Sequence, residues 1–276
     1  LVAGLLPRYS EPELGLARLT LLLPSTRAVR TVQEAFIRLS GQGLLMPRMA
    51  VVGDLDLDET LGPLLDPLGA GSAIPRAADP TRRLFKLAQF VPAAMAALGS
   101  EAPRGAALLR IAQEIARAID RLLVEDIDPE TLFGDRVREV LTDLSEHWLE
   151  NTKLFAAVHT MWRAELNDRG EIDAAARRNR LFARAAEKWR AEPPATPIVA
   201  AGVTSAAPAL AELLKVVSEL PQGAVILPDL DLAMPAEVWD ELGSAGAPEA
   251  DPPLARGDAV THPQYHLKLL LNRMGV

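Results

Sequence analysis

Hydrophobic positions in this chain follow two periods, one typical of buried strands and one typical of helices that cover a sheet. Four short, largely apolar runs are bounded by proline, glycine or polar residues: 17–23, 44–52, 197–201 and 224–228. Runs of this length predict strands that are buried on both faces. Pro47 interrupts the second run, so we expect that strand at an edge of the sheet.

The segment after the first strand predicts a helix that ends near residue 40. One face carries apolar side chains at helical spacing: Val29, Val32, Phe36 and Leu39. Ser25 or Thr26 can cap the start of this helix, because hydroxyl oxygens accept bonds from first-turn amides. Gly41 can close its end.

Residues 197–228 predict a strand, a small polar turn at 202–208, an apolar-faced helix and a second strand. Two strands joined through a helix are normally parallel, and ligands bind beyond their carboxyl ends. Those ends read Ala-Gly-Val-Thr-Ser and Pro-Asp-Leu-Asp here. The first offers no acid or base where a nucleotide hydrolase keeps its catalytic carboxylates. The pattern therefore indicates a nucleotide-enzyme architecture without an obvious active site.

From about 81 to 191 the spacing is helical. Helices are predicted at 81–98, 102–125, 135–164 and 174–191, with a short one starting at 129 and a closing one at 266–274. Asp173 can cap the helix that follows it. The simplest organisation is one sheet in two parts, 1–80 and 192–276, with 81–191 as a helical insertion and right-handed crossovers between strands.

The composition of the chain excludes several kinds of functional site. Apolar residues make up 49% of the 276, as in globular proteins, and there is no cysteine. That excludes disulfides, thiolate zinc sites and cysteine-ligated iron–sulfur clusters, and it fits a reducing cytoplasm. No apolar run reaches the roughly 18–20 residues of a membrane span. The net charge of −8 opposes tight DNA binding by this chain alone, although a local basic strip can still contact phosphates.

Three catalytic signatures were considered. No GxxxxGK[ST] string occurs, so we expect no ATP hydrolysis by this polypeptide. His262 and His266 flank Pro263 and do not predict a zinc site.

The third signature is acidic. A cluster of carboxylates lies at Asp54, Asp56, Asp58 and Glu59. Residues 56–60 match DxDxT, a pattern found in phosphotransferases that use Mg²⁺, and Asp229 and Asp231 could complete the metal site. Gly53 and Asp54 interrupt the strand which that motif requires, so an exposed acidic loop is the expected state.

Five segments in this order carry a family resemblance: LTLLLPSTRAVRTVQEAFIRLSG, LLMPRMAVVGDLD, GEIDAAARRNRLFARAAEKW, PIVAAGVTSAAPALAELLKVVSELPQGAVILPDLDL and THPQYHLKLLLNRMGV. Together they resemble the N-terminal region of the AddB family, in its alphaproteobacterial form. AddB is a subunit of the AddAB helicase–nuclease, which resects DNA double-strand breaks for homologous recombination.

The resemblance implies an α/β fold with a RecA-like (P-loop NTPase, superfamily 1 helicase-like) parallel sheet and a large all-helical insertion. It implies an inactivated helicase domain, with a strand and a degenerate phosphate loop upstream of residue 1. ATP, Mg²⁺ and an iron–sulfur cluster belong to other parts of that complex, so no cofactor is expected in these residues. The implied partners are an AddA-like motor subunit and DNA ends, with no membrane.

The resemblance also assigns candidate contact residues. The segment with Ser25, Thr26, Arg27 and Arg30 matches motif Ia, which contacts the DNA backbone in active helicases; the alternative is a capped helix with solvated arginines. Thr204 and Ser205 form the analogous junction in the second half, or else a helix cap. A basic run on one predicted helix could bind DNA or AddA, or form a solvated face: Arg177, Arg178, Arg180 and Arg184.

The sequence thus predicts a non-catalytic, helicase-like scaffold that guides DNA and docks a motor subunit. One alternative is a stand-alone Mg²⁺-dependent phosphohydrolase using the carboxylates of residues 54–59, whose activity Asp56→Asn would abolish. Another is a protein-interaction module with no role in DNA binding.

Overall fold

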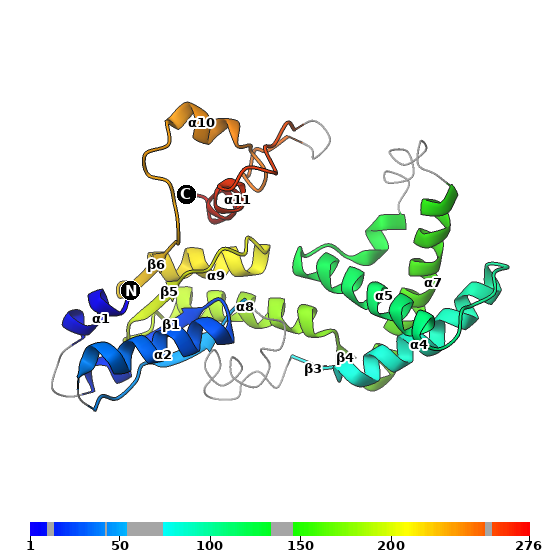
Figure 1. The fold of residues 1–276 in the computed structure, drawn as a ribbon, viewed down its shortest axis with the longest axis horizontal. Helices are drawn as coiled ribbons and strands as arrows, with labels where there is room; N and C mark the ends of the chain where they lie inside the picture. The colour runs from blue at the N-terminus through cyan, green and yellow to red at the C-terminus, as the bar shows by residue number, and fades with distance from the viewer. Residues whose placement is uncertain (10–13, 42, 54–73, 134–145, 252–255) are drawn as a thin grey trace. The chain divides into compact units, whose positions relative to one another are not determined.

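The computed structural model describes residues 1–9, 14–41, 43–53, 74–133, 146–251 and 256–276. The four predicted strands lie in one parallel sheet with the order β2-β1-β5-β6 (Figure 1). Their bounds are Thr20–Leu23 for β1, Arg48–Val51 for β2, Ile198–Ala201 for β5 and Gly223–Ile226 for β6. The mixed α/β fold with a parallel sheet is therefore confirmed. The edge position predicted for the strand after Pro47 is also confirmed.

The central pair of strands joins two distant parts of the chain. Leu22 of β1 lies opposite Ala50 of β2 on one side and opposite Ala200 of β5 on the other. From β1 the chain crosses outward to β2, and from β5 it crosses in the opposite direction to β6. The junction between β1 and β5 is consequently a topological switch point of the kind at which open α/β sheets bind ligands.

Helices cover both faces of this sheet. Right-handed crossovers in opposite directions place α2 (Thr26–Ser40) and α9 (Pro208–Glu219) on opposite faces, and Figure 1 shows them on either side of the strands. Phe36 of α2 and Val2 and Leu5 of α1 (Val2–Arg8) pack with one face of β1 and β5. α9 buries a row of aliphatic side chains: Leu210, Leu213, Leu214 and Val217.

Two predicted features of α2 are confirmed and one is wrong. Ser25 is the N-cap, and its Oγ accepts from the Ala28 amide at 3.2 Å. Gly41 closes the helix with φ of 64°, a left-handed conformation that glycine adopts without strain. Leu39, however, is 53% exposed, so the buried stripe of this helix stops at Phe36.

The chain divides into two compact units. The sheet unit comprises Leu1–Gly71 and Arg180–Val276, and the helical unit comprises Ser72–Asn179. The sequence placed the division at 81 and 191 instead. α8 (Ala174–Ala191) is one helix that begins in the helical unit and ends in the sheet unit, so no break in the pattern marks that boundary.

The C-terminal part of the sheet unit adds α10 (Ala236–Glu241) and α11 (Tyr265–Met274), and α11 packs on α9. Because α11 begins at Tyr265, His262 and His266 do not share a helix. Among the described residues, no helix combines the length and the apolar character needed to cross a membrane.

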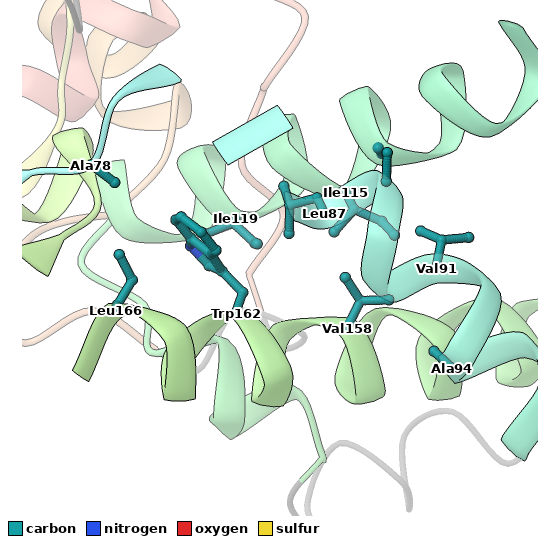
Figure 2. Close-up of a cluster of buried hydrophobic side chains, with 11 residues drawn as sticks. Ala78, Leu87, Val91, Ala94, Ile115, Ile119, Val158, Trp162 and Leu166 are labelled. Atoms are coloured by element: carbon teal, nitrogen blue, oxygen red, sulfur yellow. The ribbon is translucent and has the colours of Figure 1, made fainter. Parts of the chain in front are cut away.

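The helical unit is built from α4 (Pro80–Ala97), α5 (Ala106–Val124) and α7 (Glu146–Arg169), with the short 3-10 helix η3 (Pro129–Phe133). Leu87, Val91, Ile119 and Val158 belong to one buried apolar cluster with the fully buried Trp162 (Figure 2). Two very short strands, β3 (Arg76–Ala77) and β4 (Glu171–Ile172), pair in parallel in this unit. The sequence did not predict them, because two residues carry no periodicity.

A buried ionic cluster lies beside this core. The Arg83 guanidinium bonds both carboxylate oxygens of Asp120, at 2.8 and 2.9 Å, and its Nε lies 2.9 Å from Asp173 Oδ1. Trp162 Nε1 donates to the Asp173 carboxylate at 3.0 Å. The carbonyl of Asp173 accepts the first bond of α8, as an N-cap should, but its carboxylate is engaged by Arg83 and Trp162. Burial raises the pKa of Asp120 above its ordinary value, although the charge of Arg83 opposes this.

Removal of Arg83 should destabilise the protein strongly, because it leaves two largely buried carboxylates without their cation. We expect Arg83→Leu to lower the free energy of unfolding by about 3 kcal/mol. The matched control is Arg117→Leu, which breaks an ion pair with Glu114 in which both side chains are more than 60% exposed. That variant should change stability by less than about 0.5 kcal/mol. Urea denaturation followed by circular dichroism measures both, and equal losses would contradict the role of the cluster.

His159 on α7 is a second buried polar group, 6% exposed and stacked on Phe155 with 6.0 Å between ring centroids. Burial lowers the pKa of its imidazole below 6.5. The carboxylates of Asp173, Asp128 and Glu130 oppose this shift, while the Arg163 charge adds to it. The neutral ring is therefore the form that the fold favours.

Acid should weaken the fold through His159. Since its folded pKa lies below its unfolded value, it stabilises the fold above pH 6.5, and that contribution is lost as pH falls through the folded pKa. Asp120, whose pKa is raised, acts in the opposite sense at lower pH. We expect His159→Gln to show a smaller loss of unfolding free energy between pH 7.5 and pH 5.5 than the wild type. His266→Gln, at an exposed position, is the control; the same pH slope in all three proteins would refute this role.

Candidate ligand site at the carboxyl ends of the strands

A cavity of about 420 Å³ opens at the carboxyl ends of β1, β5 and β6. Its volume lies in the range of ligand pockets, roughly 300–1,000 Å³. The lining residues come from the starts of α1 and α2 and from the ends of the three strands: Leu1, Leu23, Pro24, Ser25, Arg27, Ala28, Thr31, Val32, Ala201, Gly202, Ile226, Leu227 and Pro228. The cavity thus occupies the switch point between β1 and β5, and most of its walls are aliphatic.

The polar groups of the cavity all come from α2. A helix N-terminus leaves its first amides without intrahelical partners, and Ser25 Oγ satisfies only that of Ala28. Arg27 is exposed and no carboxylate in the described parts of the chain pairs with it. Free amides, a hydroxyl and a guanidinium together suit an anionic group such as a phosphate.

Close backbone contacts shape the turns around the cavity. Gly202 has φ of 73°, and its amide donates to the Ile226 carbonyl at 2.9 Å, joining the ends of β5 and β6. Val52 donates to the Leu23 carbonyl at 2.8 Å at the other side. A Cβ atom on Gly53 would lie 2.1 Å from the Pro24 carbonyl oxygen, so only glycine fits there. The Pro24 wall therefore depends on Gly53.

No carboxylate is among the described residues that line the cavity. β5 runs into Ala201 and Gly202, as the sequence indicated, and the described residues hold no group of three or more His, Cys, Asp or Glu suited to a metal. Asp54, Asp56, Asp58 and Glu59 lie outside the described residues. Asp229 and Asp231 are exposed beyond β6, where Gln264 donates to the Asp229 carbonyl and accepts from the Asp231 amide.

The predicted contact residues are only partly brought together. Ser25 and Arg27 line the cavity, whereas Thr26 and Arg30 are exposed on α2 outside its lining. Thr204 lies in the turn after β5, outside the lining.

The helix cap that we considered for Thr204 and Ser205 is wrong. The N-cap of α9 is Ala207, without a side-chain bond, because Pro208 starts the helix two residues later than such a cap requires. Ser205 Oγ lies 3.5 Å from the Ala207 amide, at the limit of a hydrogen bond.

The basic run on α8 does not form one surface. Arg178 is 4% exposed, and burial lowers the pKa of its guanidinium while the charge of Glu125 opposes this. Arg177 is half-buried and its Nε donates to the Pro75 carbonyl at 3.0 Å. Arg180 is exposed and Arg184 is half-buried. The proposed partner surface is thus corrected to Arg180 and Arg184, because the start of α8 is buried in the fold.

The sequence pointed to the strand end at Pro228 but did not single out Thr31, Ile226 or Leu227 as lining residues. The signal for the wall from Ile226 to Pro228 was present, since ligands bind beyond the ends of neighbouring parallel strands and β6 was predicted next to β5. No model of a known protein family matches this chain, and no curated protein matches it significantly.

Gly53→Ala should disturb the Pro24 wall, because the new methyl group meets a backbone oxygen that has no room to move. We expect a loss of about 1–3 kcal/mol in unfolding free energy, as for other overpacked sites. Gly43→Ala is the matched control, since a Cβ there has nothing within 4 Å. Urea denaturation compares the two, and a Gly53→Ala protein as stable as the control would refute the close contact.

Proposed function

We propose that this chain is an inactivated, helicase-like scaffold domain of an AddB-type subunit. In this proposal the parallel sheet is RecA-like and the helical unit is its insertion. The observation that carries it is the strand order β2-β1-β5-β6 with the helical unit inserted between β2 and β5, together with a strand-end cavity whose described lining holds no carboxylate. That combination supports a nucleotide-enzyme architecture that serves in binding and not in catalysis.

The proposed DNA contact is the N-terminal half of α2. It offers the hydroxyls of Ser25 and Thr26, the first-turn amides and the exposed guanidiniums of Arg27 and Arg30, groups that suit contact with a phosphate backbone. Local charge supports this site: residues 1–53 hold six arginines against three glutamates, in a chain whose net charge is −8. The rest of the chain therefore repels DNA, and contact concentrates on this strip.

The proposed role is to guide DNA ends and to dock an AddA-like motor subunit during double-strand-break repair. ATP-driven translocation and nuclease chemistry, with their Mg²⁺ and iron–sulfur cluster, are assigned to other parts of that complex. Arg180 and Arg184 remain candidates for the partner surface.

DNA binding tests the proposal. Fluorescence anisotropy with a labelled duplex should show binding at about 50 mM salt that weakens steeply toward about 200 mM. The double variant Arg27→Ala/Arg30→Ala should bind at least about tenfold more weakly, with a salt slope smaller by about 2, because two phosphate contacts are lost. Arg38→Ala, in the last turn of the same helix, is the control and should bind like the wild type. A wild-type protein without affinity at low salt would refute the contact.

A further inference from the structure

The outer face of α2 carries a feature that a phosphate contact leaves unexplained. Arg30, Glu34 and Arg38 follow each other at four-residue spacing on the side away from the core, and Ile37 stands among them with 65% of its surface exposed. Neither arginine pairs with a carboxylate in the described part of the chain. A large aliphatic side chain between unpaired cations is typical of a protein contact.

A surface of complementary chemistry lies on the same chain. We name residues 229–241 the acidic arm; they hold five carboxylates and no lysine or arginine. Leu232 is 90% exposed and Val238 is 40% exposed. The arm thus combines acidic and apolar groups, whereas the outer face of α2 combines two arginines and Glu34 with Ile37.

The orientation of α10 leaves one side of the arm unoccupied. Lys268 of α11 lies 5.1 Å from the Trp239 ring and 3.6 Å from Asp240, so this side of α10 faces α11. The side of α10 away from that contact holds Glu237, Val238 and Glu241. Neither glutamate forms an ion pair with another described residue. The three residues form an acidic, partly apolar face.

The two faces lie on opposite sides of one molecule. α11 packs on α9, and α9 and α2 cover opposite faces of the sheet (Figure 1). A contact between these two faces therefore requires a second copy of the chain. We propose that the acidic arm of one molecule docks on the outer face of α2 of another, through Arg30, Ile37 and Arg38. The contact joins different surfaces, so it builds head-to-tail chains of molecules.

This inference does not rest on DNA binding, and its test needs no DNA. Sedimentation velocity at about 50 mM salt should show a weight-average sedimentation coefficient that rises over about a hundredfold range of protein concentration. Raising salt to about 200 mM should weaken the association, because exposed charges are screened. A wild type that sediments as a monomer throughout this range would overturn the proposal.

Charge reversal identifies the surfaces. Arg30→Glu/Arg38→Glu should be monomeric, and so should Glu237→Arg/Glu241→Arg, because each then opposes like charges. Mixing the two variants should restore association, since each new face meets a partner of opposite charge. Arg110→Glu, at an exposed position of α5, should associate like the wild type. If the mixture stays monomeric while the wild type associates, a different surface is responsible and the proposal fails.

Discussion

The rest of the structure depends on the parallel pairing of β1 with β5. Both strands are central, so each must be apolar on both faces, and Leu21, Leu22 and Val199 are almost completely buried. Their pairing brings Pro24 beside Gly202 and creates the switch point at which the cavity opens. The direction of the two crossovers then determines which face each helix covers. The candidate site is thus a consequence of strand order, and the chemistry of α2 decides what it can bind.

The helical unit is stabilised in a different way from the sheet, because its centre combines an apolar core with a buried ionic cluster. Arg83 satisfies Asp120 and Asp173 together, and Asp173 also accepts from Trp162. The cluster joins α4, α5 and α7 to the start of α8, where the chain leaves this unit. A buried charge is costly without partners, so packing arrangements that separate Arg83 from these carboxylates are disfavoured. We interpret the cluster as the reason for a unique packing of largely aliphatic helices.

The sequence predicts a structural feature well when its cause lies in neighbouring residues, and poorly when its cause is a contact between distant segments. β1 and β5 were predicted because strands that are buried on both faces leave short, largely apolar runs in the sequence. Ser25 was predicted because a side-chain oxygen next to the start of a helix can cap it. The burial of Arg178 was not predicted, because arginine spacing on a helix looks the same whether the helix is solvated or enclosed. The burial of Arg83 was not predicted either, because only the fold brings its partners on α5 and before α8 close to it. At the site, Ser25 and Arg27 were predicted, and the wall from Ile226 to Pro228 required the register of β6 against β5.

The separation of β1 and β5 along the chain also bears on synthesis. β1 ends at Leu23 and β5 begins at Ile198, so an emerging chain holds an unpaired strand edge, apolar on both sides, until the second half exists. At about 5–20 residues per second, the roughly 150 residues between β2 and β5 take about seven to thirty seconds to make. The helices of the inserted unit have local contacts and are complete within that interval. A ribosome therefore delivers a finished insertion while the sheet around it is still half built, and during that time the open edge needs protection from other chains.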